Sequence, residues 1–410
     1  MLRGQSTNMH KAQFGIWILG AIAIYSVSDG SNVGKLIVPL LLVFLTAFLL
    51  SKYRLRYFEY LLFFAISAAS LLGLSETLTG SHAESDYALL FGLSFYSASM
   101  AYLIAEKKFN YGSVLSVSNP LLLSTGPIAL YVISISHMRF TKRLQYYIPF
   151  ILVGMFMFQI VGSPLTEFFF LIKNTDVVSS IAFAIIFELF VYTNFCGLSL
   201  LIYGLFGVFG YRIPLNFTQP FSSRNIIEFW RGWHTSLSQV LKVLFYNPIR
   251  KKYSIFYALL AVYLSSAMWH GVTFNFILWG LFHALCFWFS IKLLKQKHSL
   301  LPLILLPFII VLGRLIFADS NTARLLEKLG FSFNGFGAIS EIFMVPMHSI
   351  LALLFGMLII ACEFIFRNYR VMRKRNYKFL RSPVALLTLG VLALLFASDV
   401  GVNYAVYGQR

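Results

Sequence analysis

Long apolar stretches with few charged positions follow one another along most of the 410-residue chain. Residues 33–50, 58–74 and 384–395 are typical of this pattern. A helix needs about 20 such residues to cross roughly 30 Å of hydrocarbon. The pattern predicts an all-α, polytopic transmembrane helical bundle of about 11 spans, at 14–27, 33–50, 57–74, 87–105, 146–162, 177–209, 253–269, 273–291, 300–317, 346–366 and 384–398.

Two stretches depart from this pattern. Residues 111–137 are apolar but interrupted by Asn119-Pro120 and Gly126-Pro127, which predicts a re-entrant or broken segment packed inside protein or lining a cavity. Residues 211–253 mix basic and aromatic side chains, which favours helices at the cytoplasmic interface. Because the sequence shows no internal repeat or soluble-domain linker, we expect residues 1–410 to form a single membrane domain.

Composition and charge support a membrane location. Hydrophobic residues make up 59% of the chain and charged residues only 12%, whereas soluble proteins carry about 25% charged residues. The first apolar run lacks a clear small-residue cleavage site and is interpreted as a span rather than a removed signal peptide. The net charge of +18 falls mainly in short loops, which indicates orientation in an anionic membrane rather than nucleic-acid binding. We expect a multi-pass cell-membrane protein with a cytoplasmic N-terminus and an outer C-terminus.

Two histidines are the candidates for chemistry. His234 lies in the segment of mixed basic and aromatic residues, and His270 ends an apolar span. A histidine at membrane depth is costly when charged, so each is a functional candidate, with a structural hydrogen-bonding role as the alternative. Neither has a cysteine or carboxylate nearby at metal-ligand spacing, so we expect no metal site. The three cysteines form no CxxC motif and are interpreted as free thiols: Cys196, Cys286 and Cys362.

Four motifs stand together around these histidines: Phe229-Trp-Arg-Gly-Trp-His-Thr-Ser-Leu-Ser238, Phe245-Tyr-Asn-Pro248, Met268-Trp-His-Gly271 and Phe276-Ile-Leu-Trp-Gly-Leu-Phe-His283. They resemble the core of the membrane-bound O-acyltransferase family, in particular the branch of alginate O-acetylation and teichoic acid D-alanyl transfer. Weaker similarity at Ser124-Thr-Gly-Pro-Ile128, Asn216-Phe217 and Leu312-Gly-Arg-Leu-Ile-Phe-Ala318 extends the family-like core to about residues 90–320.

The resemblance implies that His270 is the catalytic histidine and His234 a second active-site histidine. A neutral imidazole in a low-dielectric cavity suits the removal of a proton from an acceptor hydroxyl. Trp269, Trp279, Asn275 or backbone amides are candidate donors to the developing oxyanion, although tryptophans at span ends also serve as interface anchors. The substrate-binding candidates are Trp230, Arg231, Trp233, Trp269 and Asn275.

The chain also departs from the alginate-type pattern. Asn194-Phe-Cys-Gly-Leu-Ser-Leu200 replaces a run that usually contains two aspartates and a tyrosine. Gly232 replaces the second arginine of a Trp-Arg-Arg-Trp pattern, and Lys242-Val-Leu244 replaces Arg-Asp-Tyr. These changes bear on the acceptor and the partner surface more than on the acyl chemistry.

The resulting hypothesis is an O-acyltransferase that moves an acetyl group from a cytoplasmic thioester to a hydroxyl of a cell-surface or extracellular polysaccharide. We expect no bound cofactor, because acetyl-CoA or an acyl-carrier thioester would be the donor substrate. The expected partners are the lipid bilayer and an extracytoplasmic transferase or acyl carrier protein. The alternatives are D-alanyl transfer to teichoic acid and a lipid or glycan transporter without acyl chemistry.

Overall fold

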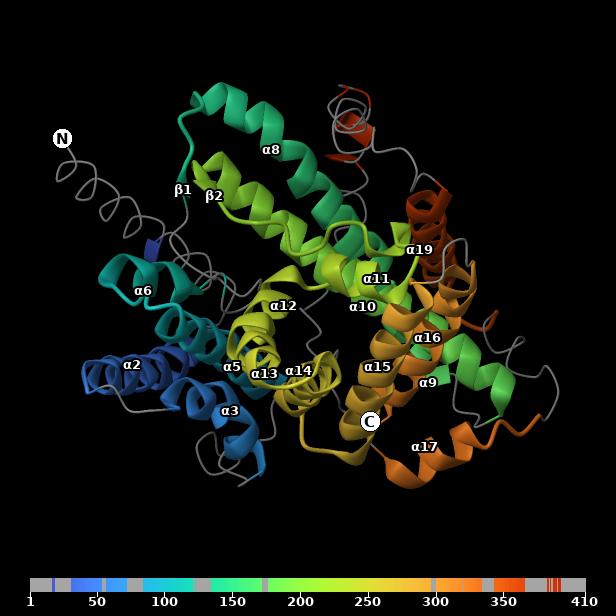
Figure 1. The fold of residues 1–410 in the computed structure, drawn as a ribbon. Helices are drawn as coiled ribbons and strands as arrows, with labels where there is room; N and C mark the ends of the chain where they lie inside the picture. The colour runs from blue at the N-terminus through green and yellow to red at the C-terminus, as the bar shows by residue number, and fades with distance from the viewer. Residues whose placement is uncertain are drawn as a thin grey trace. The chain divides into compact units, whose positions relative to one another are not determined.

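A computed structural model of the chain describes residues 17–18, 31–53, 57–71, 84–120, 122, 134–171, 176–295, 300–319, 321–333, 343–365, 382, 384, 386–388 and 390–391. The described residues are predominantly helical, which confirms the predicted helical class (Figure 1). Among them, the one ladder pairs β1 (Ser134–Ile135) antiparallel with β2 (Tyr211–Arg212), with Ser134 opposite Arg212 and Ile135 opposite Tyr211.

The N-terminal helices are α2 (Ser31–Lys52), α3 (Phe58–Leu71), α5 (Glu84–Ala105) and α6 (Tyr111–Val117). The middle of the chain contains α8 (Phe140–Met155), η1 (Phe156–Gly162), η2 (Ser163–Thr166), α9 (Glu167–Leu171), α10 (Val177–Val208), η3 (Pro220–Ser222), α11 (Ile226–Gly232), α12 (Thr235–Leu241), η4 (Lys242–Tyr246) and α13 (Asn247–Lys252). The last described helices are α14 (Ile255–His270), α15 (Phe274–Leu293), α16 (Leu301–Ala318), α17 (Thr322–Leu329) and α19 (Met347–Ile365).

The helices coincide with nine of the predicted spans, from 33–50 to 346–366. Five of the described helices are long and apolar enough to cross a membrane, at Phe140–Phe169, Val177–Val208, Phe274–Leu293, Leu301–Ala318 and Met347–Ile365. The predicted spans 14–27 and 384–398 and the loop 367–381 lie largely or wholly outside the described residues. The count of about 11 spans and the orientation of the termini therefore stay predictions.

The predicted broken segment is described at its two ends. α6 ends at Val117, two residues before Asn119-Pro120, and β1 begins at Ser134. Gly126-Pro127 lies outside the described residues.

Backbone contacts divide the chain into two compact units. The first comprises residues 1–137, 210–214 and 236–272, and the second comprises residues 138–209, 215–235 and 273–410. Each has its own buried core, while the expected single membrane domain stays a prediction.

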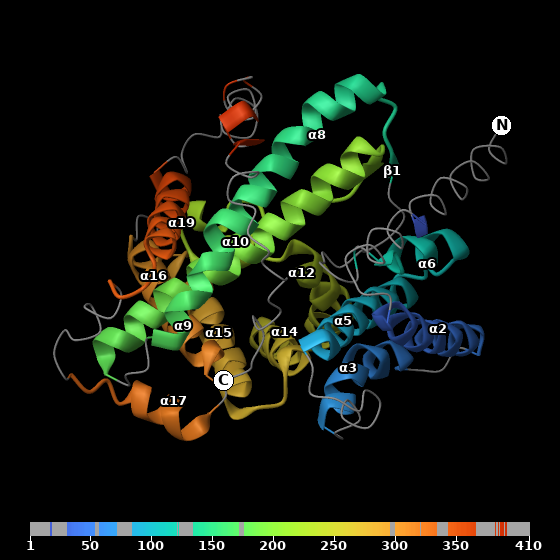
Figure 2. The same cartoon turned by 180° about the vertical axis from the view of Figure 1, so that it is seen from behind.

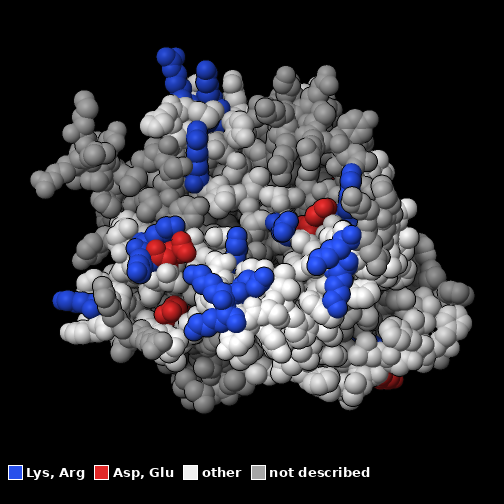
Figure 3. Space-filling view, viewed as in Figure 1, with Lys and Arg blue, Asp and Glu red and all other residues white. Residues whose placement is uncertain are grey.

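The core of the first unit joins α3 and α5 to η4 and α14. Phe245 of η4 packs against Phe63 and Phe64 of α3, at ring-centroid distances of 5.3 and 5.7 Å. Trp269 of α14 packs against Phe95 of α5 at 5.8 Å. Exposed basic residues end α13, and Figure 3 shows blue side chains gathered over this helix: Arg250, Lys251 and Lys252.

The second unit is built on α10, a 32-residue helix that lies side by side with α8 (Figure 2). Glycines allow the two backbones to touch. A β-carbon on Gly154 would lie 2.6 Å from the carbonyl oxygen of Gly197, and one on Gly197 would lie 2.8 Å from that of Gly154. Close approach through small residues is typical of helices packed within a membrane. Gly204 and Gly207 of α10 also lie against α8, and Gly162 of η1 lies against Asn194 of α10.

Candidate functional site

His234 occupies a tight connection between two short helices. Trp233 caps the C-terminus of α11, α12 begins at Thr235, and His234 between them has a positive φ of 44°. This left-handed conformation costs a residue other than glycine about 1 kcal/mol or more, and it persists only when its surroundings fix it. His234 is buried, at 5% exposure.

The backbone conformation of His234 is held by hydrogen bonds to residues 215–218, shortly before η3. The amide of Thr235 donates to the carbonyl of Asn216 at 2.9 Å, and the amide of Thr218 donates to the carbonyl of Gly232 at 2.9 Å. The hydroxyl of Thr235 donates to the carbonyl of Leu215 at 2.7 Å. These three hydrogen bonds hold residues 232–235 against residues 215–218 and thereby define the backbone at His234.

The imidazole of His234 is oriented by a buried amide. Its Nδ1 lies 3.2 Å from Oδ1 of Asn216, while Nδ2 of Asn216 donates to Oγ of Ser199 at 3.3 Å. With the amide in this orientation Asn216 presents its acceptor to the ring, so in a neutral imidazole Nδ1 carries the proton. The lone pair of the neutral imidazole is then on Nε2, the atom suited to accept a proton from an acceptor hydroxyl.

Aromatic rings enclose this histidine. Phe195 of α10 meets the imidazole edge-to-face at 4.8 Å, and Phe217 packs on both Phe195 and Trp233, at 5.1 Å each. Such a setting lowers the local dielectric and strengthens every hydrogen bond to the ring. Phe195 belongs to the stretch 194–200 that departs from the family pattern, so the departure lies directly beside His234.

A second aromatic group lies where α11 meets α15 and α16. Trp230 packs edge-to-face against Trp279 at 5.6 Å and against the buried ring of His283 at 5.1 Å. His283 is pressed against α16, because a β-carbon on Gly313 would lie 2.4 Å from its Nε2. Of the two tryptophans predicted to bind substrate, Trp230 of α11 packs against Trp279 and His283, whereas Trp233 packs against Phe217. Arg231 between them is exposed.

Arg314 and Glu188 form an ion pair next to the ring of Trp233. Nε of Arg314 on α16 donates to a carboxylate oxygen of Glu188 on α10, and both side chains are at most 10% exposed. The guanidinium also lies 5.5 Å from the ring of Trp233 and 5.4 Å from that of Phe317. Arginine suits this position because it can pair with a carboxylate and stack on aromatic faces at once.

A carboxylate from α19 supports the same region from the other side. Glu363 accepts a hydrogen bond from the hydroxyl of Tyr192 on α10 and another from the amide of Phe221 at 3.1 Å. The ring of Tyr192 packs against Phe221 at 4.9 Å and Trp233 at 5.8 Å. Glu363 thus joins α10, η3 and α19 around the turn that leads into α11.

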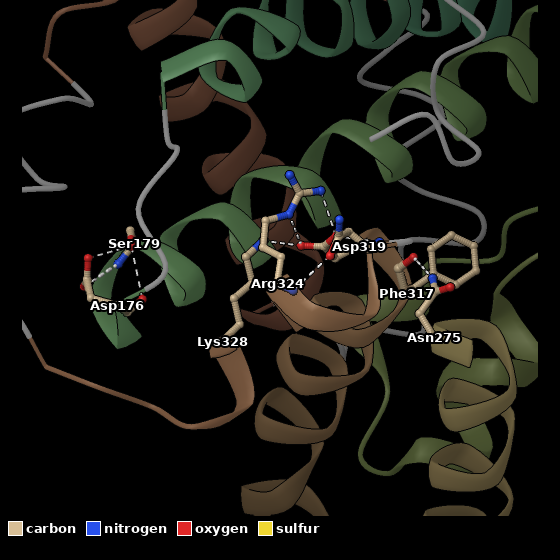
Figure 4. A network of polar contacts seen from close by, with 8 residues as sticks. Asp176, Ser179, Asn275, Phe317, Asp319, Arg324 and Lys328 are labelled. Carbon is tan, nitrogen blue, oxygen red and sulfur yellow. Dashed lines mark hydrogen bonds and ion pairs between the residues drawn. The ribbon is translucent and has the colours of Figure 1, made fainter. Parts of the chain in front are cut away.

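The end of α16 is fixed by a network of polar contacts (Figure 4). Asp319 accepts from Arg324 at 2.6 and 2.7 Å and from Lys328 at 2.9 Å. Burial alone would raise the pKa of the Asp319 carboxyl, but the hydrogen bonds and charges of Arg324 and Lys328 outweigh it and lower this pKa.

Asn275, a predicted substrate-binding residue, lies next to this corner. Its amide nitrogen donates to the carbonyl of Phe317 at 3.0 Å (Figure 4), and its oxygen accepts from the hydroxyl of Thr273. The amide therefore connects the N-terminal end of α15 to the C-terminal end of α16.

His270 belongs to the first unit, whereas His234 belongs to the second, so the structure does not bring the two histidines together within one unit. His270 is the last residue of α14, is half-buried, and packs against Trp269 at 4.9 Å. Gly271 caps the helix with an extended φ of 160°. Of the predicted site residues, His270 and Trp269 lie in the first unit, and His234, Trp230, Arg231, Trp233 and Asn275 lie in the second.

Three supporting residues were not assigned a role from sequence. Asn216 and Arg314 stand in stretches whose similarity to the family is weak. Glu363 lies beyond the core expected from sequence, and the signal that could have indicated it is a carboxylate within an otherwise apolar span. Within the described residues, no three His, Cys, Asp or Glu side chains cluster as a metal site would require.

Comparison with known proteins places this arrangement in context. The chain is 37% identical over 100 residues to the peptidoglycan O-acetyltransferase of Helicobacter pylori, covering 23% of this chain and 18% of that protein. It is 32% identical over 165 residues to the probable alginate O-acetylase of Pseudomonas aeruginosa, covering 37% and 31%. It is 27% identical over 172 residues to the teichoic acid D-alanyltransferase of Bacillus subtilis, covering 37% and 43%.

These alignments span less than half of each relative's length. The family model covers much more of this chain. The model of the membrane-bound O-acyltransferase family matches residues 18–296, which include His234, His270 and most of the elements around them. The match extends over more than half of the 410 residues, and the chain therefore belongs to the membrane-bound O-acyltransferase family.

Proposed function

We propose that the protein is an O-acyltransferase that moves an acetyl group from a thioester donor to a hydroxyl of a cell-surface or extracellular polysaccharide, directly or through a partner. The observation that carries the proposal is the buried His234, whose Nδ1 is held by Asn216 so that Nε2 has the lone pair. A base of this kind contributes about 10²- to 10⁴-fold to proton transfer in other enzymes. His270, at the end of α14, is the second proposed catalytic residue.

Acetyl is the preferred acyl group because relatives named peptidoglycan O-acetyltransferase and probable alginate O-acetylase both match this chain above 30% identity. The proposed donor is acetyl-CoA or an acyl-carrier thioester, and the proposed partner for indirect transfer is an extracytoplasmic transferase. Exposed basic residues in both units suit the phosphates of such a donor.

The test measures the O-acetyl content of the surface polysaccharide in cells that carry His234→Ala or His270→Ala. We expect each variant to reduce O-acetylation at least about a hundredfold. His348→Ala is the matched control, since this histidine is exposed on α19 and should leave O-acetylation unchanged. Protein abundance in the membrane is measured in parallel. Full O-acetylation in either active-site variant at normal abundance would contradict the role of that histidine.

D-alanyl transfer to teichoic acid is the second candidate, because the teichoic acid D-alanyltransferase of Bacillus subtilis aligns over 172 residues. The same cells distinguish the two reactions. Release of ester-linked acetate that depends on His234 supports acetyl transfer, whereas release of ester-linked D-alanine supports the second candidate. Incubation of the purified protein with labelled acetyl-CoA then tests the donor.

A further inference from the structure

The second unit contains an apolar groove of about 380 Å³. Its lining comes from one residue of α11, from the C-terminal half of α15 and from the first half of α16: Ile226, Leu285, Cys286, Trp288, Phe289, Ser290, Leu293, Pro302, Leu305 and Ile309. The volume lies within the range of about 300–1,000 Å³ that small-molecule sites occupy.

The face around the groove has the exposure expected of a surface in contact with lipid. Leu285 and Phe289 of α15 are 52% and 50% exposed, and Ile304 and Phe308 of α16 are 56% and 68% exposed. Both helices are long and apolar enough to span a membrane. The groove is therefore open to hydrocarbon chains rather than to an aqueous substrate.

One polar side chain in the lining of the groove, Ser290, has a hydroxyl that needs a hydrogen-bond partner. Oγ of Ser290 has no hydrogen-bond partner within the described part of the chain, and Ser290 is only 5% exposed. A buried hydroxyl without a partner costs about 1–3 kcal/mol, and hydrocarbon alone cannot provide one. The groove thus suits an amphiphile that combines an apolar chain with a hydrogen-bond acceptor near its head.

Positive charge stands at the same end of the groove. Nζ of Lys292 lies 3.5 Å from the ring centroid of Trp288, a lining residue, and this contact holds the ammonium beside the groove. Lys295, one turn further on, is exposed. Arg224 is also exposed and stands two residues before the lining residue Ile226. Basic pockets between membrane helices bind the phosphates of anionic lipids.

We propose that this groove is a selective site for an anionic diacyl phospholipid. One acyl chain lies between α15 and α16, the hydroxyl of Ser290 donates to an ester carbonyl, and the phosphate lies against Lys292. The site does not include the residues around His234, and it stands whether or not the acyl-transfer proposal holds.

The test uses the purified full-length protein in bilayers of phosphatidylcholine that contain a small, equal fraction of brominated phosphatidylglycerol or brominated phosphatidylcholine. Bromine on the acyl chains quenches tryptophan fluorescence on contact. Subtraction of the Trp288→Phe variant isolates the signal of the groove. We expect the brominated phosphatidylglycerol to quench this signal about fivefold more effectively, because one lysine near an anionic lipid contributes about that preference.

Variants of the basic and polar residues identify the contacts. Lys292→Gln should bring the preference close to one, Lys292→Arg should retain it, and Ser290→Ala should reduce binding of both lipids. Lys251→Gln is the matched control, since this exposed lysine of α13 belongs to the other unit and should leave the preference unchanged. Monodisperse elution from a sizing column verifies the fold of each variant.

Three outcomes would overturn the proposal. Equal quenching by the two lipids would show that the groove does not select charge. A preference that survives Lys292→Gln would place the anionic site elsewhere. Quenching of Trp288 by neither lipid would show that protein, such as a second copy or a partner helix, covers the groove.

Discussion

The hydroxyl of Tyr192 donates a hydrogen bond to the carboxylate of Glu363, which joins two helices from positions 171 residues apart. The other carboxylate oxygen accepts from the amide of Phe221, at the turn before α11. An ionisable group held this way inside a helical membrane protein marks a position whose polar partners matter. Because the ring of Tyr192 also packs on Trp233, this contact reaches the residue next to His234.

Removal of this hydrogen bond should destabilise the second unit. We expect Tyr192→Phe to lower the free energy of unfolding by about 1–3 kcal/mol, because the carboxylate loses a donor in a buried setting. Glu363→Ala should cost more, since Tyr192 and the amide of Phe221 both lose their acceptor. Thermal unfolding in detergent measures both. The control is Tyr257→Phe, at a tyrosine that is 56% exposed, and equal stability of the two Tyr→Phe variants would contradict the prediction.

Asn216 should act as a positioning residue for His234. Replacement by leucine removes the acceptor at Nδ1 and, with it, the preference for the reactive tautomer. Groups that orient a histidine in this way typically contribute about 10- to 100-fold to activity where they have been measured at metal sites, and we expect a loss of similar size here. Acyl transfer by membranes of matched protein content provides the measurement.

A graded series separates orientation from folding. Asn216→Asp keeps an acceptor at Nδ1 and should retain more activity than Asn216→Leu, with a shifted pH profile because a charged partner favours the imidazolium. Ser199→Ala removes only the hydroxyl that orients the amide and should have the smallest effect. The same loss in all three variants, with unchanged stability, would indicate that Asn216 does not position His234.

The contact of α8 with α10 should tolerate no side chain at its centre. In Gly197→Ala the new methyl group would lie 2.8 Å from the carbonyl oxygen of Gly154 and from the amide of Phe158, so the helices must separate. We expect a loss of about 1–3 kcal/mol of stability, the range for overpacked cores. Gly390→Ala is the matched control, because its added methyl group would meet nothing within 4 Å. Similar melting temperatures of the two variants would contradict this interpretation.

Asp319 should make the free energy of unfolding depend on pH, with lower stability in acid. The pKa of its carboxyl is lowered in the folded protein from an ordinary value of 3.8, so the ionised form is favoured by folding. The resulting stabilisation is complete above the unfolded pKa and is lost as the pH falls through the folded pKa.

Unfolding measured from pH 7 down to about 3 checks this dependence. Asp319→Asn should be less stable than the natural chain at neutral pH, by up to about 3 kcal/mol, because Lys328 is also largely buried. The difference should narrow only below the ordinary carboxyl pKa. A difference that is constant down to pH 3 would exclude Asp319 as its source.

The sequence predicted the helices well because hydrophobic length is a local property. The apolar stretches 273–291 and 300–317 correspond closely to α15 and α16, within two residues at each end. The stretch 146–162 was too short, since the apolar helix continues from Phe140 to Phe169 through a π-helical and a 3₁₀ turn. Irregular turns of this kind depend on packing against α10 and leave little trace in hydrophobicity.

Residues that support the candidate site were harder to predict because their partners lie far away in the sequence. His234 was identified from its motif, but its left-handed backbone depends on hydrogen bonds from residues 215–218. Glu363 is 129 positions beyond His234 and belongs to a helix that resemblance to the family did not reach. The clearest local signal for Arg314 and Glu188 was that each places a charge in an apolar stretch, which indicates a partner without naming it.

The glycine contact between α8 and α10 also limits how the protein can move. Two helices whose backbones touch cannot slide or rotate independently without collision, so they are expected to travel as one rigid body during any cycle of substrate entry and release. α19 meets α10 less tightly, since a methyl group on Gly356 would lie at an ordinary 3.4 Å from Leu189. The contact of α19 with α10 is held instead by side chains, among them the hydrogen bond from Tyr192 to Glu363, so the α8–α10 pair is the more rigid of the two contacts.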